Sequence, residues 1–187
     1  MNIELTEDHR YINDAGVEFP GVTGTIGDAG YMGWLPRDQY YLDRGTAVHL
    51  ATELDDQGVL DESSVDPVVA PFLDAWRAYR RDTHREFLFF EKQLYHPTFG
   101  YCGTLDRDGL DIKTGCEYKW HKVQAAAYLQ LMLVNGYPLP DKWISVYLKQ
   151  DGKYNTRPYD ILTLLREFQA FTSALVTANW KRENKIT

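Results

Sequence analysis

The chain has 187 residues, of which 44% are hydrophobic and 25% are charged, and its formal net charge is −7 at pH 7. This composition is that of an ordinary globular protein, and the length predicts a single domain over residues 1–187. Non-specific binding to nucleic acid depends on lysines and arginines that neutralise phosphates, so the negative charge argues against a protein that coats nucleic acid by bulk electrostatics. A local site could still act on phosphate where bound metal ions supply positive charge.

The sequence shows no membrane or export signal. No apolar run has the length needed to span a bilayer, and "MNIELTEDHR" lacks the basic and then apolar regions of a signal peptide. We therefore expect a cytoplasmic protein of a bacterium or of a phage-infected host cell, without a membrane partner. The two cysteines, Cys102 and Cys116, are too few to hold an iron–sulfur cluster, and we expect both to be free thiols.

The N-terminal half is predicted to be mainly helical. The first forty residues are rich in glycine and indicate an irregular segment with a short strand over 22–26. Apolar residues then recur at helical spacing over 42–58, where Gly58 marks the end. A second helix is expected over 68–82, with a bend at Pro71.

The C-terminal half predicts most of a sheet. Bulky residues over 85–97, 99–107 and 109–115 indicate three strands, and the turn Arg107-Asp108-Gly109 joins the last two into a hairpin. A helix over 119–136, a strand over 142–152 and a long helix over 158–184 follow. This order predicts an α/β fold, in which a small mixed sheet is flanked by helices.

The segment "GTLDRDGLDIKTG", residues 103–115, carries the chemistry of interest. Alternate residues of a strand share a face, so Asp111 and Lys113 point one way and Ile112 points the other. Asp106 and Asp111, at adjoining strand ends, are placed to share a divalent cation such as Mg²⁺, with the carbonyl of Ile112 as a third ligand. Lys113 would lie beside the attacking water.

These residues resemble the PD-(D/E)XK nuclease superfamily, and their surroundings resemble its RecB-like exonuclease branch. Five elements occur in the family order over about residues 40–150: "RGTAVH" at 44–49, Glu91 in a strand, "GTLD" at 103–106, "DIK" at 111–113, and Gln124 with Tyr128 on one helix. The resemblance implies a restriction-endonuclease-like core. With two cysteines the chain is most similar to the compact, cluster-free exonucleases of phages and of mitochondrial genome maintenance.

The resemblance also implies roles for individual residues. Asp106, Asp111 and Lys113 would be catalytic, and Asp106, Asp111, Ile112 and His49 would hold Mg²⁺ or Mn²⁺. Gln124 and Tyr128, four residues apart, would bind the substrate. Glu91 and Arg44 would be accessory residues.

The implied activity is a metal-dependent DNA exonuclease that hydrolyses phosphodiester bonds to leave 5′-phosphate products, in recombination, repair or replication. Single-stranded DNA or duplex ends would be its partner, together with a recombination or replication protein. Two alternatives remain open: a structure-selective endonuclease or RNase with the same metal core, and a non-catalytic DNA- or protein-binding module of the same fold. The segment "KQDGKYNTR", residues 149–157, is either a contact to a phosphate backbone or a solvated hairpin end.

Overall fold

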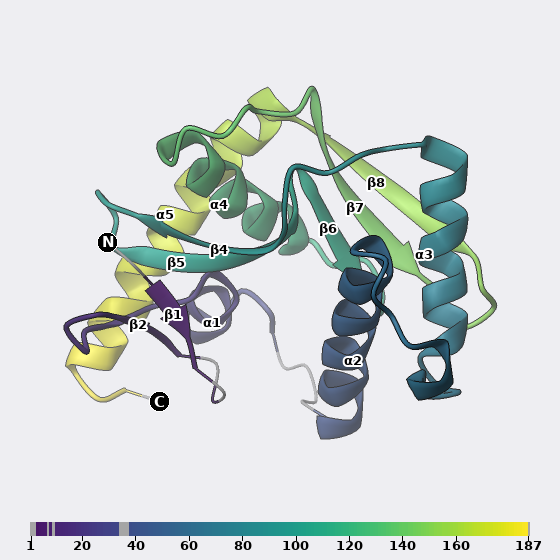
Figure 1. Cartoon of the computed structure of the whole chain (residues 1–187). Coiled ribbons are helices and arrows are strands. Elements are labelled where there is room, and N and C mark those ends of the chain that lie inside the picture. The colour runs from purple at the N-terminus through teal and green to yellow at the C-terminus, as the bar shows by residue number, and fades with distance from the viewer. Residues whose placement is uncertain (1–2, 7, 9, 34–37, 187) are drawn as a thin grey trace.

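The computed structural model describes residues 3–6, 8, 10–33 and 38–186. Its centre is a five-stranded mixed sheet in the order β4-β5-β6-β7-β8 (Figure 1). The strands are β4 (Phe90–His96), β5 (Tyr101–Arg107), β6 (Leu110–Lys113), β7 (Lys142–Leu148) and β8 (Tyr154–Asp160). Strands β6 and β7 are parallel, and the other neighbours are antiparallel. The predicted α/β class with a small mixed sheet is confirmed.

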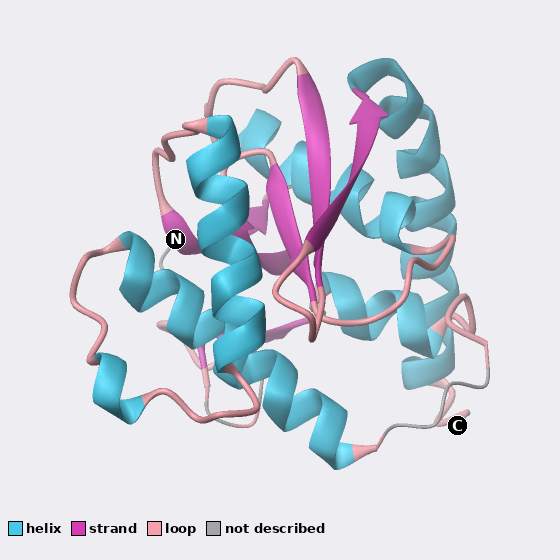
Figure 2. Ribbon diagram, turned by 90° about the vertical axis from the view of Figure 1, so that its right-hand side faces the viewer, coloured by secondary structure: helices cyan, strands magenta, loops and turns pink. Residues whose placement is uncertain are grey.

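Helices cover both faces of this sheet, as Figure 2 shows from the side. One face packs against α4 (His121–Val134) and α5 (Ile161–Glu183), and the other against α2 (Gln39–Asp56) and α3 (Ala70–Thr83). A short 3-10 helix, η1 (Glu62–Ser64), lies between α2 and α3 in the chain. In the described part of the chain, no helix combines the length and apolarity that crossing a membrane requires.

The two faces have separate hydrophobic clusters. The alternation along β6 and β7 sends Leu110, Ile112 and Val146 into the α2–α3 cluster, and Trp143 into the α4–α5 cluster. Asp111 is on the α4–α5 face, as the strand period predicts for a neighbour of Ile112. A polar residue on a buried face of the central strand needs partners, which the site provides.

The N-terminal segment corrects the first prediction. Residues 22–26 form no strand but lie in helix α1 (Val22–Asp28), which follows a small sheet of β1 (Ile3–Leu5), β2 (Tyr11–Asn13) and β3 (Glu18–Phe19). The β-branched residues suggested a strand. However, Val22 and Ile26, four residues apart, are both buried against the α4–α5 cluster, and this packing outweighs local propensity.

The C-terminal segment corrects the second prediction. The closing helix begins at Ile161 and not at 158, because residues 154–160 form the edge strand β8. Pro158 lacks a backbone donor and suits an edge position, and the mostly exposed, polar β8 has no alternating pattern that would have revealed it. Residues 149–157 therefore form the turn of the β7–β8 hairpin and the first half of β8. Pro71 lies in the first turn of α3, where proline is tolerated without a bend.

Candidate active site

The candidate site lies where strands β5 and β6 part. The register of these strands pairs Arg107 with Leu110 beside the turn, and no further register pair follows in the described chain. Beyond it, the carboxylate of Asp106 replaces a main-chain acceptor: its Oδ2 accepts a hydrogen bond from the backbone N–H of Ile112 at 2.5 Å. A side chain of one strand thus bridges the opening to the backbone of the next. We call this opening the β5–β6 split.

Three ligand atoms gather on the α2 side of the split. The Nδ1 atom of His49, on α2, lies 3.4 Å from Oδ1 of Asp106 and 3.5 Å from Oε1 of Glu91. Among the described residues, these three offer ligand atoms that all lie within 4.8 Å of one another. The two carboxylates are donors that suit Mg²⁺ or Mn²⁺, whereas an imidazole nitrogen is more typical of transition-metal sites. The residues present therefore fit a divalent cation, and Glu91 is more central than the sequence predicted.

Glu91 reaches this position through an unusual backbone. Its φ angle is 42°, in the left-handed region that residues other than glycine rarely adopt. It lies in β4 between two register pairs, Phe90 with Arg107 and Lys92 with Leu105, and so stands opposite Asp106. Strained backbone of this kind concentrates at functional sites.

The charges of His49, Asp106 and Glu91 shift one another's pKa values. Burial disfavours the protonated imidazole, but the carboxylates of Asp106 and Glu91 outweigh it and raise the pKa of His49 to about 9. Burial raises the pKa of Asp106 to about 6, although the charge of His49 acts to lower it. Burial would also raise the pKa of Glu91, but the hydrogen bond and charge of His49 lower it. His49 thus balances part of the acidic charge at the split.

Lys113 occupies the other side of the split. Its Nζ donates to Oδ1 of Asp111 at 2.7 Å and to Oε1 of Gln124 at 2.6 Å. Oδ2 of Asp111 accepts a hydrogen bond from the hydroxyl of Ser145, on the neighbouring strand β7, at 3.1 Å. The carboxylate of Asp111 is therefore held from both sides, close enough that its charge acts on Asp106.

The helix pair predicted to bind substrate is buried behind the lysine. Gln124 donates from Nε2 to the hydroxyl of Thr23 at 2.8 Å and to that of Tyr128 at 3.4 Å, while its carbonyl holds Lys113. Burial raises the pKa of Tyr128 well above its usual value. Gln124 thus links Lys113 to Thr23 and Tyr128, so the position of this helix pair in the fold is that of a support for the lysine.

Arg44 connects helix α2 to the segment after the lysine. Its Nη2 donates to the backbone carbonyl of Thr114 at 3.0 Å, and its guanidinium lies against the rings of Tyr41 and Phe72. This contact ties the helix that carries His49 to the strand end that carries Lys113.

A buried ion pair that sequence reasoning missed lies under the acidic cluster. The side chain of Arg107 is fully buried, and its Nε and Nη2 lie 2.9 and 2.8 Å from Oδ2 of Asp56. Its Nη1 donates to the backbone carbonyl of Asp106 at 2.5 Å and lies 3.7 Å from Oε1 of Glu91. Three aromatic rings surround the guanidinium, from Trp76, Phe87 and Phe90. Arg107 thus supports both carboxylates of the cluster. The signal in the sequence was an arginine within the expected strand 99–107.

Gly103 sets the approach of α4 to the sheet. A Cβ atom at this position would lie 2.7 Å from the Tyr128 ring and 2.9 Å from Leu131. We therefore expect Gly103→Ala to displace Tyr128 and to lower the free energy of unfolding by about 1–3 kcal/mol. Urea unfolding measures this effect. Gly24→Ala, in α1 with open space around it, is the control, and a Gly103→Ala protein as stable as this control would contradict the packing argument.

His121 provides a test of burial on the α4–α5 face. Its Nδ1 lies 2.7 Å from the hydroxyl of Tyr147, and burial lowers the pKa of His121 to about 3, with the charge of Lys113 acting in the same direction. The imidazole of the unfolded chain takes up a proton near its ordinary pKa of 6.5, whereas that of the folded protein stays neutral. Its contribution to stability is therefore complete above pH 6.5 and is lost as the pH falls.

We therefore expect the free energy of unfolding of the wild type to fall by about 2 kcal/mol more than that of His121→Gln between about pH 7 and pH 5. Urea unfolding of both proteins at each pH measures this difference. Other titrating groups are common to both proteins, so parallel curves would show that His121 is not held neutral.

The two cysteines lie outside the groups described above. Both cysteines are free thiols, Cys102 buried in β5 and Cys116 exposed after β6. Thr23, Ser145, Asp56 and Arg107 belong to the site although no motif contained them.

The fold agrees with that of a known structure. No protein-family model matches the sequence, and the search of curated proteins finds no match. The chain shares the α/β fold of a candidate exonuclease from Eubacterium rectale, with a TM-score of 0.61 and 13% identity over 100% of this chain and 89% of that chain. LHK-Exo in complex with dAMP aligns with a TM-score of 0.34 and 16% identity, over 89% of this chain and 93% of that one, which is too low to indicate a shared fold.

Proposed function

We propose that this protein is a metal-dependent nuclease, and more specifically a DNA exonuclease of the RecB-like type that leaves 5′-phosphate products. The observation that carries the proposal is the placement of Lys113: an ammonium fixed by Asp111 and Gln124 across the β5–β6 split from His49, Glu91 and Asp106. The shared fold with a candidate exonuclease supports it.

Hydrolysis of a phosphodiester requires compensation of charge on the phosphoryl oxygens, an aligned water and a stabilised leaving oxygen. A divalent cation held by His49, Glu91 and Asp106, with Asp111 and the carbonyl of Ile112 as further ligands, would supply the charge compensation. Lys113 orients the attacking water, because its ammonium is held in one position by two acceptors. Gln124 and Tyr128 keep the lysine in that position.

The test uses linear single-stranded and double-stranded DNA labelled at either end, circular single-stranded DNA and labelled single-stranded RNA, each with Mg²⁺, with Mn²⁺ and with EDTA. We expect cleavage of the linear substrates with either metal, no cleavage with EDTA, and an intact circle. Cleavage of the circle would replace the exonuclease by an endonuclease. Cleavage of RNA alone would make the protein an RNase, and no cleavage of any nucleic acid would leave a binding module.

A further inference from the structure

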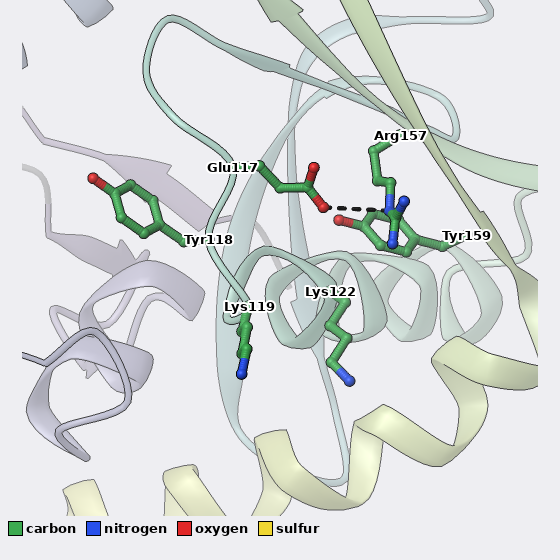
Figure 3. A pocket seen from close by; sticks show the side chains of 6 residues that line it. All are labelled: Glu117, Tyr118, Lys119, Lys122, Arg157 and Tyr159. Carbon is green, nitrogen blue, oxygen red and sulfur yellow. Dashed lines mark ion pairs between the residues drawn. The ribbon is translucent and has the colours of Figure 1, made fainter.

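A cavity of about 350 Å³ lies beside the candidate active site. It opens between the segment that joins β6 to α4 and the edge strand β8, and Figure 3 shows the side chains around it. The lining residues are Glu117, Tyr118, Lys119, Lys122, Arg157 and Tyr159. None of them belongs to the groups placed at the β5–β6 split.

Three of the lining side chains are cationic. Lys122 pairs with Glu167 of α5 at 2.5 Å, and Arg157 pairs with Glu117 at 3.3 Å across the cavity, where both side chains are more than half exposed. In Figure 3, Lys119, in the segment before α4, and Lys122, in its first turn, project in the same direction. Lys119 has no ion pair among the described residues, and the nearby N-terminus of α4 adds partial positive charge. An exposed ion pair is weak, so an anion can replace Glu117 as the partner of Arg157.

The register of the sheet places this cavity relative to the site. Asp111 pairs with Ser145, and Ser145 pairs with Arg157. Directly paired residues of neighbouring strands point to the same face, and here the hydroxyl of Ser145 does reach Asp111. Arg157 therefore starts from the same face as Asp111, two strand spacings or about 10 Å away. A nucleic-acid strand covers that distance within a nucleotide or two.

We propose that this cavity binds a phosphate of the nucleic-acid strand that neighbours the phosphodiester being cleaved, with Lys119 and Arg157 as its main contacts. The inference rests on the proposed function. Both residues are exposed cations on a wall next to the site, and a phosphodiester presents the anionic oxygens that such cations bind. The cavity would thus set the direction in which the strand leaves the site.

The experiment measures binding without hydrolysis. A fluorescent oligothymidylate of about a dozen nucleotides, within the range that single-strand binders cover, is titrated in EDTA over a series of salt concentrations. We expect the double variant Lys119→Gln, Arg157→Gln to bind roughly ten-fold more weakly at low salt, and its dependence of log affinity on log salt to be shallower by about 0.7 for each lost contact. The control variant is Lys92→Gln, Lys142→Gln, which removes two exposed charges elsewhere on the sheet. We expect this control to keep the wild-type slope.

A second readout separates this inference from the proposed function. Thymidine p-nitrophenyl phosphate has one phosphodiester and does not reach the cavity, so we expect the Lys119, Arg157 variant to hydrolyse it at the wild-type rate. If the wild type hydrolyses neither this compound nor DNA, the proposed function fails. The salt dependence of binding would then still show whether the cavity binds the oligonucleotide. Equal salt slopes for the cavity variant and the control would overturn the inference. In the same binding assay, unlabelled thymidine monophosphate and unlabelled oligothymidylate are added as competitors. If both displace the fluorescent oligonucleotide equally well, the inference is overturned in favour of a site for free nucleotides.

Discussion

Replacing Lys113 by alanine is expected to lower the rate of DNA hydrolysis by about a hundred-fold to ten thousand-fold, the range typical of positioned groups that assist proton transfer. The ammonium is 2.7 Å from Asp111 and 2.6 Å from Gln124, so no other described cation can take its place without rebuilding these contacts. Single-turnover hydrolysis of a labelled linear strand in Mg²⁺ measures the effect.

The matched control is Lys142→Ala, the same substitution at an exposed position at the start of β7. Thermal unfolding of both variants shows that the fold is retained. A Lys113→Ala protein that is as active as the control, and still inhibited by EDTA, would contradict the proposed role of the lysine.

Replacing Arg107 by alanine is expected to have the largest effect on stability, about 3–5 kcal/mol, because Asp56 would keep its charge in a buried site without its main partner. Burial already raises the pKa of Asp56 although Arg107 lies beside it, so desolvation is costly even in the intact pair. Trp76 and Arg80 also contact Asp56 and would compensate in part. Urea unfolding measures the loss.

The double variant Arg107→Met, Asp56→Asn distinguishes charge from packing. Removing both charges should restore much of the stability that Arg107→Met alone loses, as usually happens when buried ion pairs are replaced. Nuclease activity should remain low, because the contacts of Arg107 to the carbonyl of Asp106 and to Glu91 are still missing. A single Arg107→Ala protein with stability close to the wild type would contradict the buried pair.

The sequence predicted three helices and the hairpin around Asp108, and all of them exist. The amphipathic periodicity is strong in α3, whereas most residues of α4 are buried. Helix α1 and strand β8 were missed for opposite reasons. Tertiary packing overrode a local preference for strand in α1, and β8 has no buried face to leave a pattern.

The candidate site was predictable where residues are close in the sequence or follow a motif. His49, Glu91, Asp106, Asp111 and Lys113 do lie around one split, although their roles remain proposals. The partners that hold them could not be found in this way, because Thr23, Ser145 and Asp56 reach the site from elements far away in the chain, through contacts that no spacing encodes.

Because β5 and β6 part at the site, its two sides belong to different hydrophobic clusters. His49 follows Val48, which is buried between α2 and α3, while Gln124 stands on α4, whose Leu129 is buried on the opposite face. We expect that repacking either cluster would shift one side of the split relative to the other. Activity therefore depends on the relative position of the two hydrophobic clusters. We expect substitutions far from the split to lower activity more strongly than they lower stability.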